Sequence, residues 1–164
     1  MEPRVTILLV EDDPAHAEII RRNLPSSGVG CRLRHVADGQ EALDYLFRQD
    51  RFADPASSPR PDLVLLDLRL PKVAGLEVLR RLKADDSLQT IPVVVLTTSS
   101  NQPDIMDAYA NRASSYLVKP ADFTQFTDLM HAFVRYWLDL NSYANRTQDA
   151  SDPRCHSEMN ARRL

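Results

Sequence analysis

The chain has 164 residues, of which 43% are hydrophobic and 26% are charged, and its formal net charge at pH 7 is −3. These values are ordinary for one globular domain with its own core, and the negative charge gives no reason to expect nucleic-acid binding, which normally needs a basic face. No stretch reaches the roughly eighteen apolar residues of a membrane span and the N-terminus lacks the apolar core of a signal peptide, so we expect a cytoplasmic protein without membrane contact.

The first predicted elements are a buried strand and a capped helix. The strand is predicted over 5–10, where the residues are almost all leucine or β-branched. Asp13 can then cap a helix that has Pro14 at its first position, which is a favoured arrangement. This helix is expected to end near Pro25, since the residue before a proline disfavours helical geometry.

A second strand and helix are predicted next, followed by a long polar connection. The strand is predicted over 33–37, and Asp38-Gly39-Gln40-Glu41 resembles a capping box that begins the helix. This helix is expected to bury Ala42, Leu43, Leu46 and Phe47. The stretch 48–61 is long for a helix-to-strand connection, and it is either a recognition loop or a tolerated insertion.

Three further units are predicted in the second half of the chain. Apolar runs over 62–66, 93–96 and 115–118 predict the third, fourth and fifth strands. After the third strand, Pro71 and Gly75 lead into a helix with Leu76, Leu79 and Leu82 on its buried face.

Two more helices follow the fourth and fifth strands. The first is expected to begin near Pro103 and to end at Asn111, which would take the left-handed conformation common at helix ends. Asp122 is expected to cap the last helix, whose apolar residues recur at threes and fours: Phe123, Phe126, Met130, Phe133 and Trp137. Five strand–helix units joined by mostly short links predict a doubly wound α/β fold. Residues 141–164 carry few apolar side chains and no periodicity, so we expect a domain over 4–140 and an extended or disordered tail.

Charged and hydroxyl side chains stand at the carboxyl ends of the predicted strands, where parallel sheets bind ligands. Glu11 and Asp12 follow the first strand and Asp67 the third, and these carboxylates would repel one another without a divalent cation such as Mg²⁺ among them. Thr97 and Lys119 end the fourth and fifth strands, where a hydroxyl donor and a compact cation suit phosphoryl oxygens. A carboxylate such as Asp67 can itself accept a phosphoryl group as an acyl phosphate.

This set of residues, in its order and spacing, resembles the receiver domain of two-component response regulators. The resemblance covers residues 4 to about 140 and implies a flavodoxin-like, five-stranded parallel sheet of order 2-1-3-4-5 with helices on both faces. It implies that Asp67 is the phosphoacceptor and that a phosphohistidine on a partner kinase supplies the phosphoryl group. It also implies that Asp12 binds Mg²⁺ directly, that Glu11 reaches it through water and that Arg69 adds its backbone carbonyl. Thr97 and Tyr116 match the family's switch pair.

A narrower resemblance is to the single-domain regulators that partner bacterial and cyanobacterial phytochromes. It is carried by the long stretch before the third strand and by three motifs: Val10-Glu11-Asp12-Asp13-Pro14-Ala15, Leu96-Thr97-Thr98-Ser99, and the run from Lys119-Pro120 to Leu140-Asn141. It implies a phytochrome as the histidine kinase. Asp13 stands where asparagine is frequent, and it either adds an acid beside the metal site or caps the helix, of which the cap is the better interpretation.

The last helix carries apolar side chains around more than one face, which favours a homodimer with Phe126, Phe133, Tyr136 and Trp137 at its interface. The four histidines lack metal-ligand spacing, and none is assigned a catalytic role.

Other functions are weighed against the phosphorylation switch. A Mg²⁺-dependent aspartyl-phosphate phosphatase generally needs an acid two residues after the nucleophile, where this chain has Arg69. A phosphorylation-independent binding module would not need the full set of acids, threonine and lysine. We therefore expect a non-enzymatic signalling protein that catalyses only its own phosphorylation and dephosphorylation, with a different kinase or a role as phosphotransfer intermediate as the alternative.

Overall fold

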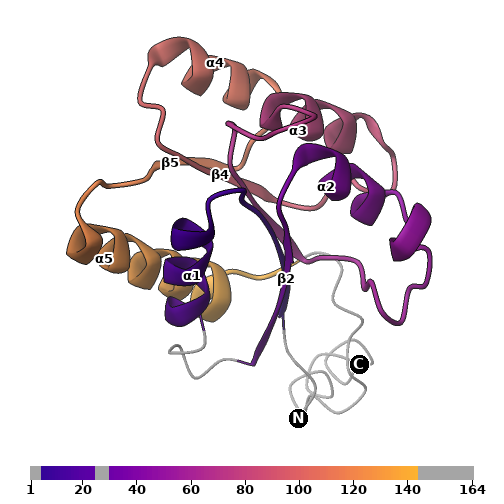
Figure 1. Ribbon diagram of the computed structural model, residues 1–164, viewed down its shortest axis with the longest axis horizontal. Coiled ribbons are helices and arrows are strands. Elements are labelled where there is room, and N and C mark those ends of the chain that lie inside the picture. The colour runs from indigo at the N-terminus through magenta and orange to yellow at the C-terminus, as the bar shows by residue number, and fades with distance from the viewer. Residues whose placement is uncertain (1–4, 25–29, 144–164) are drawn as a thin grey trace, which may run out of the picture.

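The computed structural model describes residues 5–24 and 30–143, which form a parallel sheet between two layers of helices (Figure 1). The five strands are β1 (Val5–Val10), β2 (Cys31–Val36), β3 (Leu63–Leu66), β4 (Val93–Thr97) and β5 (Ser115–Val118). Their order is β2-β1-β3-β4-β5, and every neighbouring pair is parallel. The predicted fold class is thereby confirmed, whereas residues 144–164 of the predicted tail lie outside the described part.

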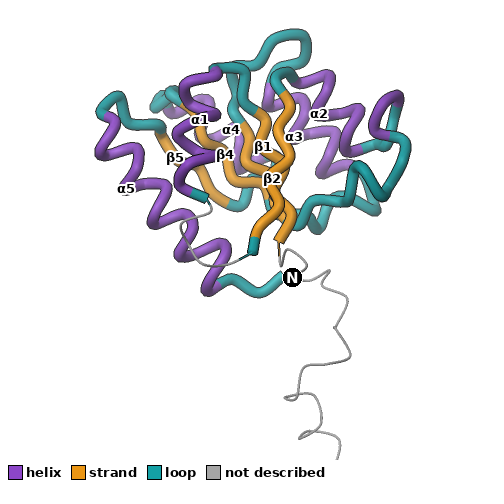
Figure 2. Tube along the Cα trace, turned by 60° about the horizontal axis from the view of Figure 1, so that its bottom comes forward, coloured by secondary structure: helices purple, strands orange, loops and turns teal. Residues whose placement is uncertain are grey.

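The helices divide between the two faces of the sheet. They are α1 (Pro14–Asn23), α2 (Gly39–Leu46), α3 (Gly75–Ala84), α4 (Gln102–Ala110) and α5 (Phe123–Val134), which continues as a π-helix, η3 (Arg135–Leu140). A short 3₁₀ helix, η2 (Asp50–Phe52), follows α2. Helices α1 and α5 cover one face, and α2, α3 and α4 cover the other (Figures 1 and 2). Within residues 5–24 and 30–143, no helix is long and apolar enough to cross a membrane.

Successive strand residues point to opposite faces, which gives two cores separated by the sheet. In β1, Ile7 and Leu9 pack with α1 and α5, whereas Leu8 and Val10 pack with α2, α3 and α4. All four side chains are buried. A strand covered on both faces must be apolar at every position, which explains the continuous runs of the sequence.

Three predicted helix caps are present in the structure. The Asp13 carboxylate accepts hydrogen bonds from the amides of Ala15 and His16, at 2.8 and 3.3 Å. Asp38 and Asp122 likewise accept from amides three residues further on. Each cap satisfies donors that the first turn of a helix leaves unpaired, so it fixes where the helix after each strand begins.

Two predictions at helix ends are wrong. Phe47 is not a buried residue of α2, because the helix ends at Leu46 and the chain turns away at Arg48, which has a φ of 56°; the Phe47 ring is 36% exposed. At the end of α4, the left-handed residue is Arg112 with a φ of 65°, and Asn111 keeps a φ of −90°. The Arg112 guanidinium donates to the carbonyl oxygen of Lys83, a contact that holds this turn in place.

The stretch 48–61 is packed against the domain. The Tyr45 hydroxyl donates to the carbonyl oxygen of Pro59 over 2.7 Å, and the Tyr45 and Phe52 ring centroids lie 5.2 Å apart. Ser58 is buried at its end. These contacts hold the long connection from α2 to β3 against the domain, and whether it is a recognition loop or a tolerated insertion stays open.

The predicted dimer interface is wrong for two of its four residues. Phe126 and Phe133 are 1% and 3% exposed and belong to the core between α5 and the sheet, so they offer no surface to a second chain. Tyr136 is 53% exposed, and its ring meets the half-buried Trp137 edge-on at 5.0 Å. The outward apolar side chains of α5 and η3 are therefore Phe123, Tyr136 and Leu140.

Candidate functional site

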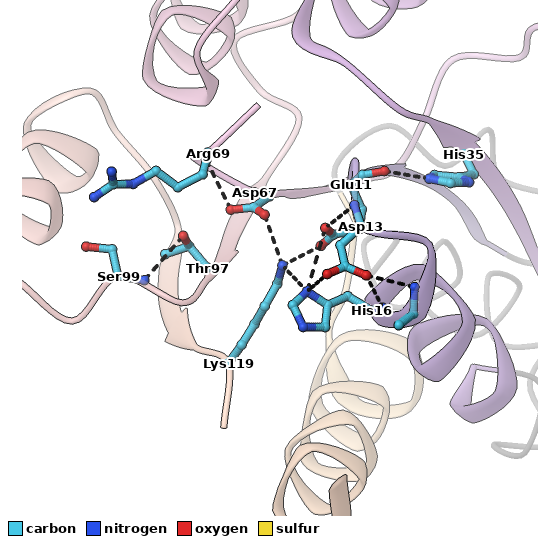
Figure 3. Close-up of polar contacts among 10 residues, drawn as sticks. Glu11, Asp13, His16, His35, Asp67, Arg69, Thr97, Ser99 and Lys119 are labelled. Carbon is cyan, nitrogen blue, oxygen red and sulfur yellow. Dashed lines mark hydrogen bonds and ion pairs between the residues drawn. The ribbon is translucent and has the colours of Figure 1, made fainter. Parts of the chain in front are cut away.

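The strand ends that carry the predicted site residues meet at one edge of the sheet. Glu11 follows β1, Asp67 follows β3, Thr97 ends β4 and Lys119 follows β5. Their side chains point toward a common centre (Figure 3). The parallel topology brings them together, since residues separated by up to 108 positions end their strands on the same side of the sheet.

Three carboxylates form an acidic cluster at this edge. Glu11, Asp12 and Asp67 each place one oxygen within 4.8 Å of the other two. Glu11 and Asp67 are buried, whereas Asp12 is exposed at the mouth of the site. Because hard divalent cations prefer carboxylate oxygens, this set fits Mg²⁺ or Mn²⁺. Asp13 is not part of the cluster, and its carboxylate caps α1 as expected.

Lys119 lies between the carboxylates and neutralises part of their charge. Its Nζ donates to Glu11 Oε2 over 2.5 Å and to Asp67 Oδ2 over 3.0 Å, and the lysine side chain is 1% exposed. Burial raises the pKa of Glu11 above its ordinary value, and the Lys119 ammonium opposes that rise. Burying a cation between two acids carries a large desolvation cost. Buried charge clusters of this kind are typical of functional sites.

The backbone around Asp67 is tightly fixed. The amide of Arg69 donates to Asp67 Oδ1 over 3.1 Å, which leaves Oδ2 for Lys119. Gly75 opens α3 directly behind, where a Cβ atom would lie 2.2 Å from the carbonyl oxygen of Asp67 and 2.6 Å from the Cα of Leu68. Only glycine permits this approach, so α3 supports the strand end that presents Asp67. The contribution of the Arg69 carbonyl to a metal stays a prediction.

The predicted switch pair is linked through Ser99. Thr97 is fully buried, and its Oγ1 accepts a long hydrogen bond of 3.5 Å from the amide of Ser99. The Tyr116 hydroxyl donates to the carbonyl oxygen of Ser99 over 2.9 Å, and its ring packs against the core next to α4. Burial raises the pKa of Tyr116. The two side chains therefore contact the same loop after β4.

The sequence did not predict two sets of contacts at this site. His16, which was expected to have no catalytic role, places its Nδ1 3.1 Å from Lys119 Nζ. Near the switch, Ser99 Oγ donates to Asp104 Oδ2 over 2.5 Å, and the Arg69 guanidinium donates to the same oxygen over 3.3 Å. The position of His16 in the first turn of α1, three residues after the cap Asp13, could have indicated that its side chain lies near the site. Nothing in the sequence pattern indicated the Arg69–Asp104 pair, which joins segments 35 positions apart.

Comparisons with known proteins agree with this geometry. The family model described as response regulator receiver domain matches residues 7–131. Response regulator Rcp1 of Synechocystis sp. is 37% identical over 84% of this chain and 91% of its own length. The probable methanogenesis regulatory protein FilR2 of Methanothrix harundinacea is 45% identical over 82% of this chain and 84% of its own length.

Solved structures give the same result. The phosphorylated cyanobacterial phytochrome response regulator RcpA matches with a TM-score of 0.81 at 38% identity, covering 85% of this chain and 98% of its own. The Mn²⁺-bound form of Rcp1 matches with the same TM-score at 36% identity and the same coverage. The bacteriophytochrome response regulator RtBRR matches with a TM-score of 0.67 at 39% identity, covering 84% of this chain and 82% of its own.

Proposed function

The chain belongs to the response regulator receiver family, and from this membership we propose that it accepts a phosphoryl group on Asp67 from a phosphohistidine of a partner kinase. One Asp67 oxygen attacks phosphorus, a phosphorus–oxygen bond forms and the phosphorus–nitrogen bond to the histidine breaks. The electron pair leaves with the imidazole nitrogen. The product is an acyl phosphate on Asp67 and a kinase returned to its unmodified state.

The arrangement of Lys119 between Glu11 and Asp67 is the observation that carries this proposal. The ammonium already lies 3.0 Å from the proposed acceptor, and it can exchange this contact for a phosphoryl oxygen. Thr97 ends the neighbouring strand, from which its hydroxyl can donate to another oxygen of the group. Fixed donors of this kind stabilise the charge of phosphoryl transfer without reorganisation.

Mg²⁺ is the proposed cofactor. Glu11, Asp12 and Asp67 would hold it together with the Arg69 carbonyl, and the cluster of carboxylate oxygens within 4.8 Å supports this set. The bound cation supplies positive charge to the transferring phosphoryl oxygens. The relative Rcp1 has a Mn²⁺-bound form, which supports a divalent cation as the cofactor.

A phytochrome is the proposed kinase. The relatives RcpA and RtBRR are described as response regulators of a cyanobacterial phytochrome and of a bacteriophytochrome, and RPA3017 of R. palustris, 32% identical, as one in red light signaling. FilR2, at 45% identity, is described instead as a methanogenesis regulator, which supports a different kinase as the second candidate. Phosphotransfer from a purified phytochrome kinase, but not from an unrelated histidine kinase, is the expected result.

The proposed output is a change of protein contacts in the cytoplasm. A phosphoryl group at Asp67 would draw the Thr97 hydroxyl toward it and loosen the loop that carries Ser99, to which Tyr116 is bonded. Such a local charge event can shift the packing of one face. The exposed apolar residues of α5 and η3 support a homodimer as one such contact, and no turnover of a separate substrate is proposed.

Incubation with acetyl phosphate and Mg²⁺, read by intact mass, tests the proposal. The wild-type chain should gain one phosphoryl group, and Asp67→Asn should gain none. Asp139→Asn, which changes an exposed aspartate of η3, is the matched control and should label like the wild type. Full labelling of Asp67→Asn would contradict the assignment, and steady hydrolysis of a small phosphate ester would favour a phosphatase.

A further inference from the structure

His16 reaches the site from the first turn of α1. The Asp13 cap accepts a hydrogen bond from the His16 amide, which sets the start of the helix and the direction of the side chain. The imidazole rests on Phe126, with ring centroids 5.8 Å apart, and its side chain is 28% exposed. The ring is therefore held between the core of α5 and the edge of the acidic cluster (Figure 3).

The shortest polar contact of the ring identifies the hydrogen-bonding role of Nδ1. Nδ1 lies 3.1 Å from Lys119 Nζ, but 3.8 Å from Glu11 Oε1 and 3.7 Å from Asp13 Oδ2. Only the contact with the ammonium is within ordinary hydrogen-bond distance. An ammonium has three donors and no acceptor, so Nδ1 must be the acceptor and the ring hydrogen must reside on Nε2.

His16 supplies the third hydrogen-bond acceptor of the Lys119 ammonium. The three N–H bonds of Lys119 have three acceptors: Glu11 Oε2, Asp67 Oδ2 and His16 Nδ1. Two of them are carboxylate oxygens, which attract the ammonium, and the third is an imidazole nitrogen on α1. We propose that His16 is a positioning residue that holds the Lys119 ammonium in the orientation needed to receive a phosphoryl oxygen at Asp67.

This inference rests on the proposed phosphorylation of Asp67, and it adds a residue to that reaction. To meet the incoming group, Lys119 must exchange one of its carboxylate contacts for a phosphoryl oxygen. With Nδ1 still bonded, the ammonium turns about a fixed contact during this exchange. Without His16, it would settle against Glu11 and Asp67, both buried, and part of the transition-state stabilisation would be lost.

Two substitutions separate positioning from packing. His16→Leu keeps an apolar side chain against Phe126 but removes the acceptor. His16→Asn loses the ring but keeps an acceptor, because Asn Oδ1, like His Nδ1, is two bonds from Cβ. His131→Leu, which changes an exposed histidine of α5, is the matched control. A packing role would be kept by leucine and lost by asparagine, and a positioning role would show the opposite.

The kinetic measurement is the rate constant of phosphorylation by acetyl phosphate at saturating Mg²⁺. We expect His16→Leu to be slower by about tenfold, the effect of losing one hydrogen bond to a charged group, and His16→Asn to recover most of the rate. His131→Leu should match the wild type. Equal rates in His16→Leu and the wild type, or equal loss in both His16 variants, would overturn the proposal.

A second readout does not depend on phosphorylation. Ring ¹⁵N shifts at about pH 8.5, where imidazoles are ordinarily neutral, should show the hydrogen of His16 on Nε2. The ammonium hydrogens of Lys119 should exchange with water about tenfold faster in His16→Leu than in the wild type or His16→Asn. A hydrogen on Nδ1, or unchanged exchange in His16→Leu, would overturn the positioning role. If no variant gains phosphate while this pattern holds, the failure belongs to the proposed function and the contact stands.

Discussion

Lys119→Met tests the electrostatic balance of the site, because methionine keeps most of the side-chain volume but removes the charge and its hydrogen-bond donors. In the wild type, the ammonium contacts Glu11 and Asp67, which are 1% and 6% exposed. The variant leaves two buried carboxylates facing one another without a cation. Removing one partner of a buried ion pair generally costs about 3–5 kcal/mol of the free energy of unfolding.

The size of this loss should depend on pH. Burial already raises the pKa of Glu11 above its unfolded value, and the loss of Lys119 must raise it further. A carboxyl whose pKa is higher in the folded state holds more protons there, so its contribution to stability declines as pH rises through the folded pKa. The deficit relative to the wild type should therefore be small at about pH 5 and approach about 3 kcal/mol at about pH 8.

Urea unfolding in the presence of a metal chelator measures this deficit at both pH values. Lys72→Met is the matched control, because its ammonium also pairs with a carboxylate, that of Asp38, while the lysine side chain itself is 65% exposed. The control should lose little stability, with no dependence on pH over this range. A deficit for Lys119→Met below about 1 kcal/mol at the higher pH, or one that is the same at both, would refute the reasoning.

Three further predictions concern the metal, the switch and assembly. Asp12→Ala should weaken Mg²⁺ binding more than Asp13→Ala, which should instead cost about 1 kcal/mol of stability through the lost helix cap; calorimetric titration compares the two, and the reverse order would exchange their roles. Thr97→Ala should leave Asp67 phosphorylatable while removing the effect of phosphorylation on dimer or partner affinity, and unchanged coupling would exclude Thr97 from the switch. Tyr136→Asp should give a folded monomer by light scattering, whereas a wild-type chain that is monomeric at micromolar concentration with and without phosphate would contradict the dimer.

The sheet and its helix caps could be predicted because their signals are local. Apolar runs mark strands that are covered on both faces, and Asp13, Asp38 and Asp122 cap helices through amides no more than three residues away. The site followed from topology, since parallel strands that each carry a polar residue at the carboxyl end must bring those residues together. Glu11 and Lys119 therefore meet although 108 positions separate them.

The features that the sequence did not predict depend on which face of a helix the core buries and on contacts between segments that are far apart in the chain. The apolar stripe of the last helix did not distinguish Phe126, which the core buries, from Tyr136, which faces outward. Arg112 rather than Asn111 is left-handed because the helix-ending turn falls one residue later than expected, where the amides of Arg112 and Ala113 donate to the carbonyl oxygens of Tyr109 and Ala108. His16 belongs to no sequence motif, and its proposed role follows only from the structure, which places Lys119 beside it.

Reductive trapping of the phosphorylated chain tests the central claim most directly. Borohydride converts an aspartyl phosphate to homoserine, and peptide mass spectrometry then locates the modified residue. After phosphorylation by acetyl phosphate or by the kinase, homoserine should replace Asp67 alone and should be absent from Asp67→Asn. Homoserine at Asp12 or at any other aspartate, with Asp67 intact in the fully phosphorylated chain, would contradict the account.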